Sequence, residues 1–79
     1  MLLEVFEIRG SAEPEVDELI IKLHKKFPDA TIRKVNVLDK EKMKGEAEIK
    51  EMIRINGLEI LPLFRLDGKI VSKDFLGQL

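Results

Sequence analysis

The stretch that decides the fold lies near the end of the chain and reads Leu61-Pro62-Leu63-Phe64-Arg65-Leu66-Asp67-Gly68-Lys69-Ile70-Val71. It holds two short apolar runs that are separated by Asp67 and Gly68. An Asp-Gly pair between two strand-like runs is the strongest short-range signal for a β-hairpin, because the tight turn needs two residues that tolerate a positive φ. The sequence therefore predicts an antiparallel hairpin that follows directly on Pro62.

Working upstream from this hairpin, apolar periodicity predicts a strand at 2–8, a helix at 14–27, a strand at 31–38 and a helix at 46–56. The first strand is apolar on both faces, so both faces need cover. Val35 and Val37 alternate with polar residues, which indicates a less buried edge strand. Strand-helix-strand units are parallel, whereas the hairpin is antiparallel. We expect one domain, 1–79, of class α/β and order βαβαββα, with a four-stranded mixed sheet between helices.

Capping residues mark the helix ends. Ser11 is a candidate cap for the first helix, and Ser72 is one for a short helix at the end of the chain. Gly45 is expected to separate a loop from the helix at 46–56, and Asn56-Gly57 is expected to end that helix with a left-handed C-cap. Glu46 and Lys50 stand four residues apart, which predicts a weak ion pair on the solvent face.

Composition limits the classes of partner. Charged residues make up 37% of the chain, against about 25% in ordinary domains, and the predominance of Lys and Glu is typical of heat-adapted cytosolic proteins. The net charge of −1 predicts no nucleic-acid partner. The uncharged runs are far shorter than the roughly 20 residues of a membrane span, and Glu4 and Glu7 interrupt any signal peptide. We expect a soluble cytoplasmic protein.

No thiol chemistry is available to the chain, because the sequence has no cysteine. His24 has no second histidine with which to form a metal site. Glu13, Glu15 and Asp17 offer carboxylates to a divalent cation, but compensation of the helix dipole already accounts for acids at a helix start. No metal and no cofactor are expected.

The order of elements resembles that of the thioredoxin-like superfamily. That superfamily carries Cys-x-x-Cys after its first strand and a cis-proline at the start of its third. Pro62 matches the second signature, whereas Ser11-Ala12-Glu13-Pro14 stands where the first would be. The resemblance implies strand order 2-1-3-4, a cis Leu61–Pro62 bond and a partner-binding groove. The residues that it assigns to this groove are Gly10, Ser11, Ala12, Pro14, Leu61 and Pro62.

Within the superfamily, Pro14-Glu15-Val16-Asp17-Glu18-Leu19 and the hairpin are similar to the arsenical-resistance trans-acting repressor and metallochaperone. The metalloid-binding cysteines of that family have no counterpart here, so metalloid binding is not carried over. Small glutaredoxins have Gly-Gly before their last helix, where this chain has Ile70-Val71-Ser72-Lys73-Asp74. Glutathione binding is not carried over either.

Three functions are therefore distinguished. The leading hypothesis is a redox-inactive thioredoxin-like adaptor that binds a protein or an extended peptide and is a monomer or weak homodimer. The second is a structural subunit that pairs through its edge strand. The third is a divergent thiol-disulfide oxidoreductase or glutaredoxin-like protein that uses an external thiol.

Overall fold

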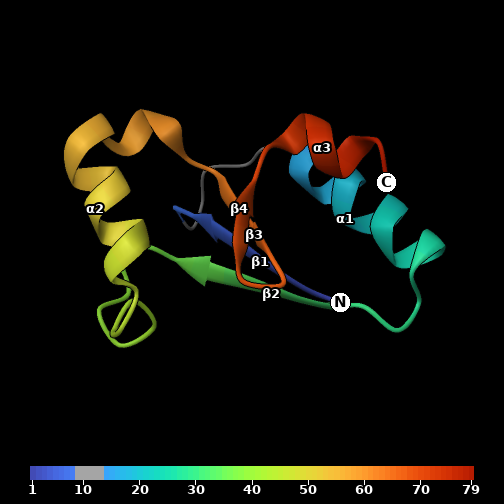
Figure 1. The fold of residues 1–79 in the computed structure, drawn as a ribbon, viewed down its shortest axis with the longest axis horizontal. Coiled ribbons are helices and arrows are strands. Elements are labelled where there is room, and N and C mark those ends of the chain that lie inside the picture. The colour runs from blue at the N-terminus through green and yellow to red at the C-terminus, as the bar shows by residue number, and fades with distance from the viewer. Residues whose placement is uncertain (9–13) are drawn as a thin grey trace.

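The computed structural model of the protein describes residues 1–8 and 14–79. In this part of the chain a four-stranded mixed sheet lies between helices (Figure 1). The elements are β1 (Leu2–Glu7), α1 (Pro14–Lys26), β2 (Thr31–Asn36), α2 (Ala47–Asn56), the 3-10 helix η1 (Leu58–Ile60), β3 (Leu63–Leu66), β4 (Lys69–Val71) and α3 (Lys73–Gly77). The strand order is β2-β1-β3-β4, which confirms the predicted order.

β1 is an inner strand of the sheet. It pairs in parallel with β2 and antiparallel with β3, and β3 pairs antiparallel with β4. β2 therefore lies at an edge, as its weak apolar pattern predicts. Arg33 and Lys34 on this strand are exposed, and charged side chains on an edge strand discourage pairing with another chain.

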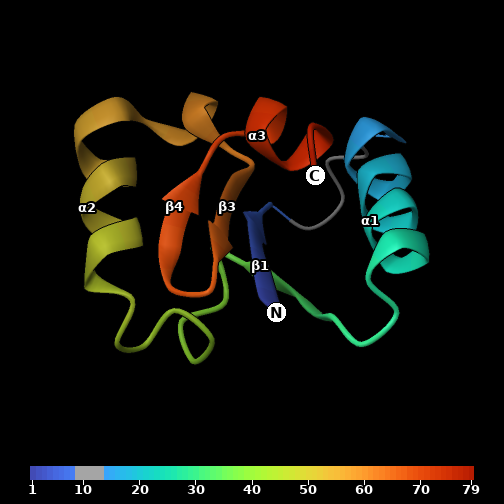
Figure 2. The ribbon, with the colours of Figure 1, turned by 45° about the vertical axis from the view of Figure 1, so that its right-hand side comes forward.

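Alternate residues of β1 enter two separate apolar clusters, because successive side chains of a strand point to opposite faces. Leu3 and Val5 belong to a cluster that includes α1 and α3, and Phe6 belongs to one that includes α2. The first cluster comprises Leu3, Val5, Val16, Leu23, Phe64 and Leu76. The second comprises Phe6, Val35, Met43, Ile49 and Leu63. Figure 2 shows α2 on one side of the sheet and α1 on the other, so both faces are covered as predicted.

Several predicted boundaries need correction. The strand at 31–38 ends at Asn36, because the Asn36 Oδ1 accepts a hydrogen bond from the Leu38 N–H at 3.2 Å and turns the chain. The strand at 2–8 ends at Glu7 and the helix at 14–27 ends at Lys26. Gly57 has φ 82° but ψ 176°, so the expected left-handed C-cap is wrong in ψ.

Other local predictions are confirmed. The Ser72 hydroxyl caps α3 by accepting a hydrogen bond from the Phe75 N–H at 3.0 Å. Gly45 has φ 85° and ends the loop before α2. Met43, in that loop, is only 3% exposed and packs into the second cluster. The apolar residues upstream of Gly45 therefore do not belong to the register of α2.

The hairpin turn has the predicted geometry. Asp67 and Gly68 have φ of 49° and 88°, and Leu66 pairs with Lys69 across the turn. The Asp67 Oδ1 accepts a hydrogen bond from the Leu2 N–H at 2.7 Å, and the Asp67 N–H donates to the Leu2 carbonyl at 2.8 Å. The turn is therefore tied to the first residue of β1.

Replacing Gly68 should test this turn directly. A Cβ at Gly68 would meet no atom within 4 Å, so Gly68→Ala should cost only the strain of its positive φ, roughly 1 kcal/mol in the free energy of unfolding. Gly77→Ala is the matched control, because Gly77 also has open space around it and lies in α3. Urea unfolding should show a loss for the first variant alone. Equal losses in both variants would mean that the hairpin turn is not the strained element.

Candidate functional site

A pocket of about 180 Å³ lies where β1 ends and β3 begins. Its position follows from the antiparallel register, which pairs Phe6 with Leu63 and so brings the residues after β1 beside those before β3. The pocket is lined by Glu7, Ile8, Val16, Leu58, Glu59, Leu61 and Pro62. Val16 of α1 and Leu58 and Glu59 of η1 complete its wall.

Two of the predicted site residues line this pocket. Leu61 and Pro62 are half-buried in its wall, and the peptide bond between them is cis, as the resemblance implies. Pro14 is exposed at the start of α1 and does not line the pocket, although Val16 in the same turn does. The other predicted members, Gly10, Ser11 and Ala12, lie outside the described residues, as does the predicted cap at Ser11.

Apolar and acidic side chains line the pocket. Glu7 and Glu59 are its charged lining residues, and the described lining includes no basic side chain. The Lys34 Nζ lies 4.0 Å from the Glu7 carboxylate but 2.8 Å from Asp17. The hydrogen bond to Asp17 is the main reason why the pKa of Lys34 is raised. Lys34 is therefore shared between Glu7 and Asp17 and lies closer to Asp17.

The sequence did not predict the other pocket residues, which are Glu7, Ile8, Val16, Leu58 and Glu59. Their positions in the sequence could have indicated two of them, because Glu7 lies near the end of the first apolar run and Glu59 lies shortly before Pro62. Of the carboxylates that were weighed as metal ligands, Glu15 pairs with Lys73 and Asp17 with Lys34, whereas Glu13 lies outside the described residues. Within residues 1–8 and 14–79, no group of three metal-ligating side chains comes together.

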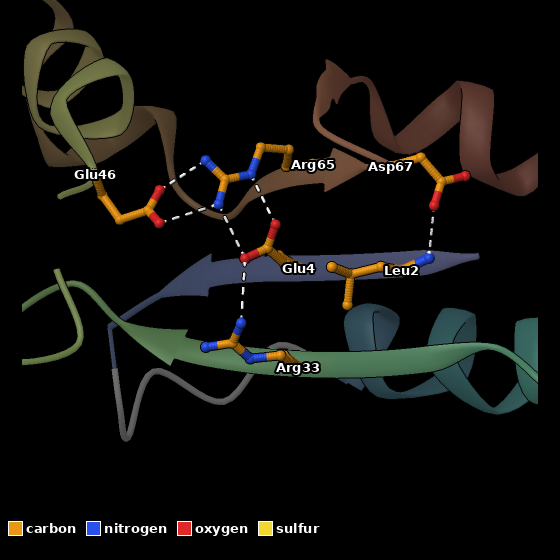
Figure 3. A network of polar contacts seen from close by, with 6 residues as sticks. All are labelled: Leu2, Glu4, Arg33, Glu46, Arg65 and Asp67. Atoms are coloured by element: carbon orange, nitrogen blue, oxygen red, sulfur yellow. Dashed lines mark hydrogen bonds and ion pairs between the residues drawn. The ribbon is translucent and has the colours of Figure 1, made fainter. Parts of the chain in front are cut away.

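Apart from the pocket, a cluster of charged side chains that the sequence did not predict crosses the sheet (Figure 3). Arg65 of β3 lies opposite Glu4 of β1 in the register. The guanidinium donates to both oxygens of Glu4, at 2.8 and 2.9 Å, and to both oxygens of Glu46, at 2.6 and 3.1 Å. Arg33 of β2 approaches Glu4 at 3.7 Å from the other side. The predicted solvent-face pairing of Glu46 with Lys50 is replaced by this contact with Arg65.

This cluster is structural in character. Glu4 is 6% exposed, and the hydrogen bond from Arg65 lowers its pKa against the opposing effect of burial. The guanidinium also lies 5.0 Å from the centroid of the Phe6 ring, within reach of a cation–π attraction. Among the described residues, no buried side-chain nitrogen or oxygen lacks a hydrogen-bond partner. The network therefore offers no unsatisfied group to a ligand.

Comparison with known proteins yields no match among protein-family models, curated proteins or solved structures. Within the part of the chain that the structure describes, no helix combines the length and the apolar character needed to cross a membrane.

Replacing Glu4 should reveal how much the network contributes. Glu4→Gln removes one charge from a buried pair, so the free energy of unfolding should fall by about 3 kcal/mol at neutral pH. The folded-state pKa of Glu4 is lowered, so its contribution is complete above the unfolded value of about 4.3 and fades as the pH falls through the folded-state pKa. Urea unfolding at several pH values should therefore show that the difference in the free energy of unfolding between wild type and E4Q becomes smaller in acid.

Glu51→Gln is the control for this experiment. Glu51 pairs with Arg54 on the exposed surface of α2, where ion pairs contribute little. Its unfolding curve should nearly coincide with that of the wild type. If the difference in the free energy of unfolding between wild type and E4Q stayed constant at acidic pH, this would contradict a role for the Glu4 charge.

Proposed function

We propose that the protein is a small thioredoxin-like binding module that holds an extended segment of a partner protein in the pocket beside Pro62, without thiol chemistry of its own. The observation that carries this proposal is the composition of that pocket, in which Leu61 and Pro62 lie beside other apolar side chains and two carboxylates. The strand order and the proline directly before β3 support the thioredoxin-like assignment. In that superfamily the same region forms the substrate groove.

The size of the pocket favours a protein partner. About 180 Å³ is below the range of roughly 300–1,000 Å³ that is usual for small-molecule pockets. Such a volume suits one or two side chains of a larger ligand. Leu58 extends the apolar wall to the surface, where 48% of it is exposed.

The charge of the pocket indicates which side chains it takes. The Ile8, Val16 and Leu61 side chains favour an aliphatic group, and Glu7 and Glu59 favour a cation next to it. We therefore expect the partner segment to place a Lys or Arg beside an aliphatic residue. So small a domain offers a limited contact area, which is typical of weak and transient complexes.

The absence of cysteine supports binding over exchange. Thiol-disulfide exchange requires a thiolate that attacks a disulfide through a mixed-disulfide intermediate, and the chain has no cysteine thiol. An insulin-reduction assay with dithiothreitol or glutathione should therefore show no acceleration over the reductant alone. Turnover would favour the alternative of an oxidoreductase that uses an external thiol.

The binding proposal predicts a specific peptide preference. Display of random nonapeptides on phage should enrich sequences in which a basic residue neighbours an aliphatic one. Titrating an enriched peptide into ¹⁵N-labelled protein should shift the amide signals of Glu7, Ile8 and the segment 58–61. Leu58→Ser combined with Glu59→Lys should weaken binding by at least about tenfold, since it removes an apolar contact and reverses a charge.

Ile55→Ser combined with Glu48→Lys is the matched control. Both residues are exposed on α2, and neither lines the pocket. This variant should bind the peptide as the wild type does. The pocket beside Pro62 would not be the binding site if the enriched peptides shifted signals only at the opposite end of the sheet. The same conclusion would follow if the peptides bound both variants equally.

A further inference from the structure

A second hollow, of about 390 Å³, lies between the end of β2, the loop at 39–45 and α2. It is lined by Val37, Lys40, Met43, Lys50 and Ile53. No residue lines both this hollow and the pocket beside Pro62, so the two are separate sites. Its apolar lining comes from three elements, and two lysines complete it.

The loop that forms one wall is held in shape by Asp39. The Asp39 Oδ1 accepts hydrogen bonds from the N–H groups of Glu41 and Lys42, at 3.1 and 3.3 Å, and the Asp39 carbonyl accepts one from the Met43 N–H at 3.0 Å. Met43 anchors the loop in the core. Lys40 is therefore carried by a fixed turn beside the hollow.

The two ammonium groups are available to a ligand. Glu46 stands four residues before Lys50 and is its natural helical partner, but its carboxylate is held by Arg65. Arg54, four residues after Lys50, is itself a cation and pairs with Glu51. Among the described residues, none forms a hydrogen bond or an ion pair with the ammonium group of Lys40 or Lys50.

We propose that this hollow binds a small amphipathic carboxylate, with the apolar body against Val37, Met43 and Ile53 and the carboxylate between Lys40 and Lys50. The volume of about 390 Å³ lies within the usual range for small-molecule pockets. A carboxylate complements the two ammonium groups, whereas an inorganic anion leaves the apolar lining unused. The proposal stands independently of the proposed function, since no residue is shared.

Octanoate is a suitable probe, with octanamide and octylamine as neutral and cationic analogues of the same chain length. Octanoate should shift the methyl signals of Val37, Met43 and Ile53 in ¹³C-labelled protein, with a dissociation constant on the order of 1 mM for so small a ligand. Octanamide and octylamine should bind several-fold more weakly. Raising the salt concentration should narrow the difference between octanoate and octanamide, because exposed charges are screened.

The lysines are tested by Lys40→Ala combined with Lys50→Ala, which should weaken octanoate binding about fivefold and leave octanamide binding unchanged. Lys25→Ala combined with Lys69→Ala is the matched control, because it removes the same charge from exposed positions outside the hollow. The control should bind octanoate as the wild type does. Octanamide binding as tight as octanoate binding, equal weakening in both variants, or shifts confined to other methyl groups would each overturn the proposal.

Discussion

The contact between Arg65 and two carboxylates is the constraint on which the rest of the structure depends. β1 is buried on both faces, so Glu4 in its middle is stable as a charge only if a cation meets it within hydrogen-bonding distance. Arg65 supplies that cation from the facing position of β3. A shift of one residue in β1 would move Glu4 into the apolar cluster with α1 and α3. The ion pair therefore selects one register, and the bond from Arg65 to Glu46 fixes the start of α2 to the same point.

Local sequence signals were sufficient for the strands and the three α-helices, but not for η1. The hairpin at Asp67-Gly68, the two-faced burial of β1, the edge position of β2 and the cap at Ser72 each depend on a few neighbouring residues, and all four are found. Boundaries were less accurate, because a side-chain hydrogen bond such as that of Asn36 can end a strand while its apolar pattern continues.

The candidate site was predictable only in part. Leu61 and Pro62 could be placed by resemblance, but Val16 and Glu59 reach the pocket through the packing of α1 and η1, which periodicity does not specify. The same limit explains the missed network. Glu4 and Arg65 each appear in the sequence as a charge that interrupts an apolar run, and the pairing of the two is seen only when the register of β1 and β3 is known. The spacing of Glu46 and Lys50 predicted an ion pair between them, but the fold brings the Arg65 guanidinium to Glu46 instead.

The two layers of the domain differ in the forces that join them to the sheet. The α2 layer adds partly buried charge-assisted hydrogen bonds from Arg65 to its apolar contacts, whereas the ion pair that joins α1 to the sheet, between Asp17 and Lys34, is exposed. The stabilisation that apolar burial provides weakens as the temperature falls. The hydrogen bonds between Arg65 and the two carboxylates do not depend on apolar burial. Cooling should therefore loosen the α1 and α3 side first, whereas acid strong enough to protonate Glu4 should weaken the Arg65 network that holds α2. One small domain would then have two distinct routes of partial unfolding, which amide hydrogen exchange can distinguish.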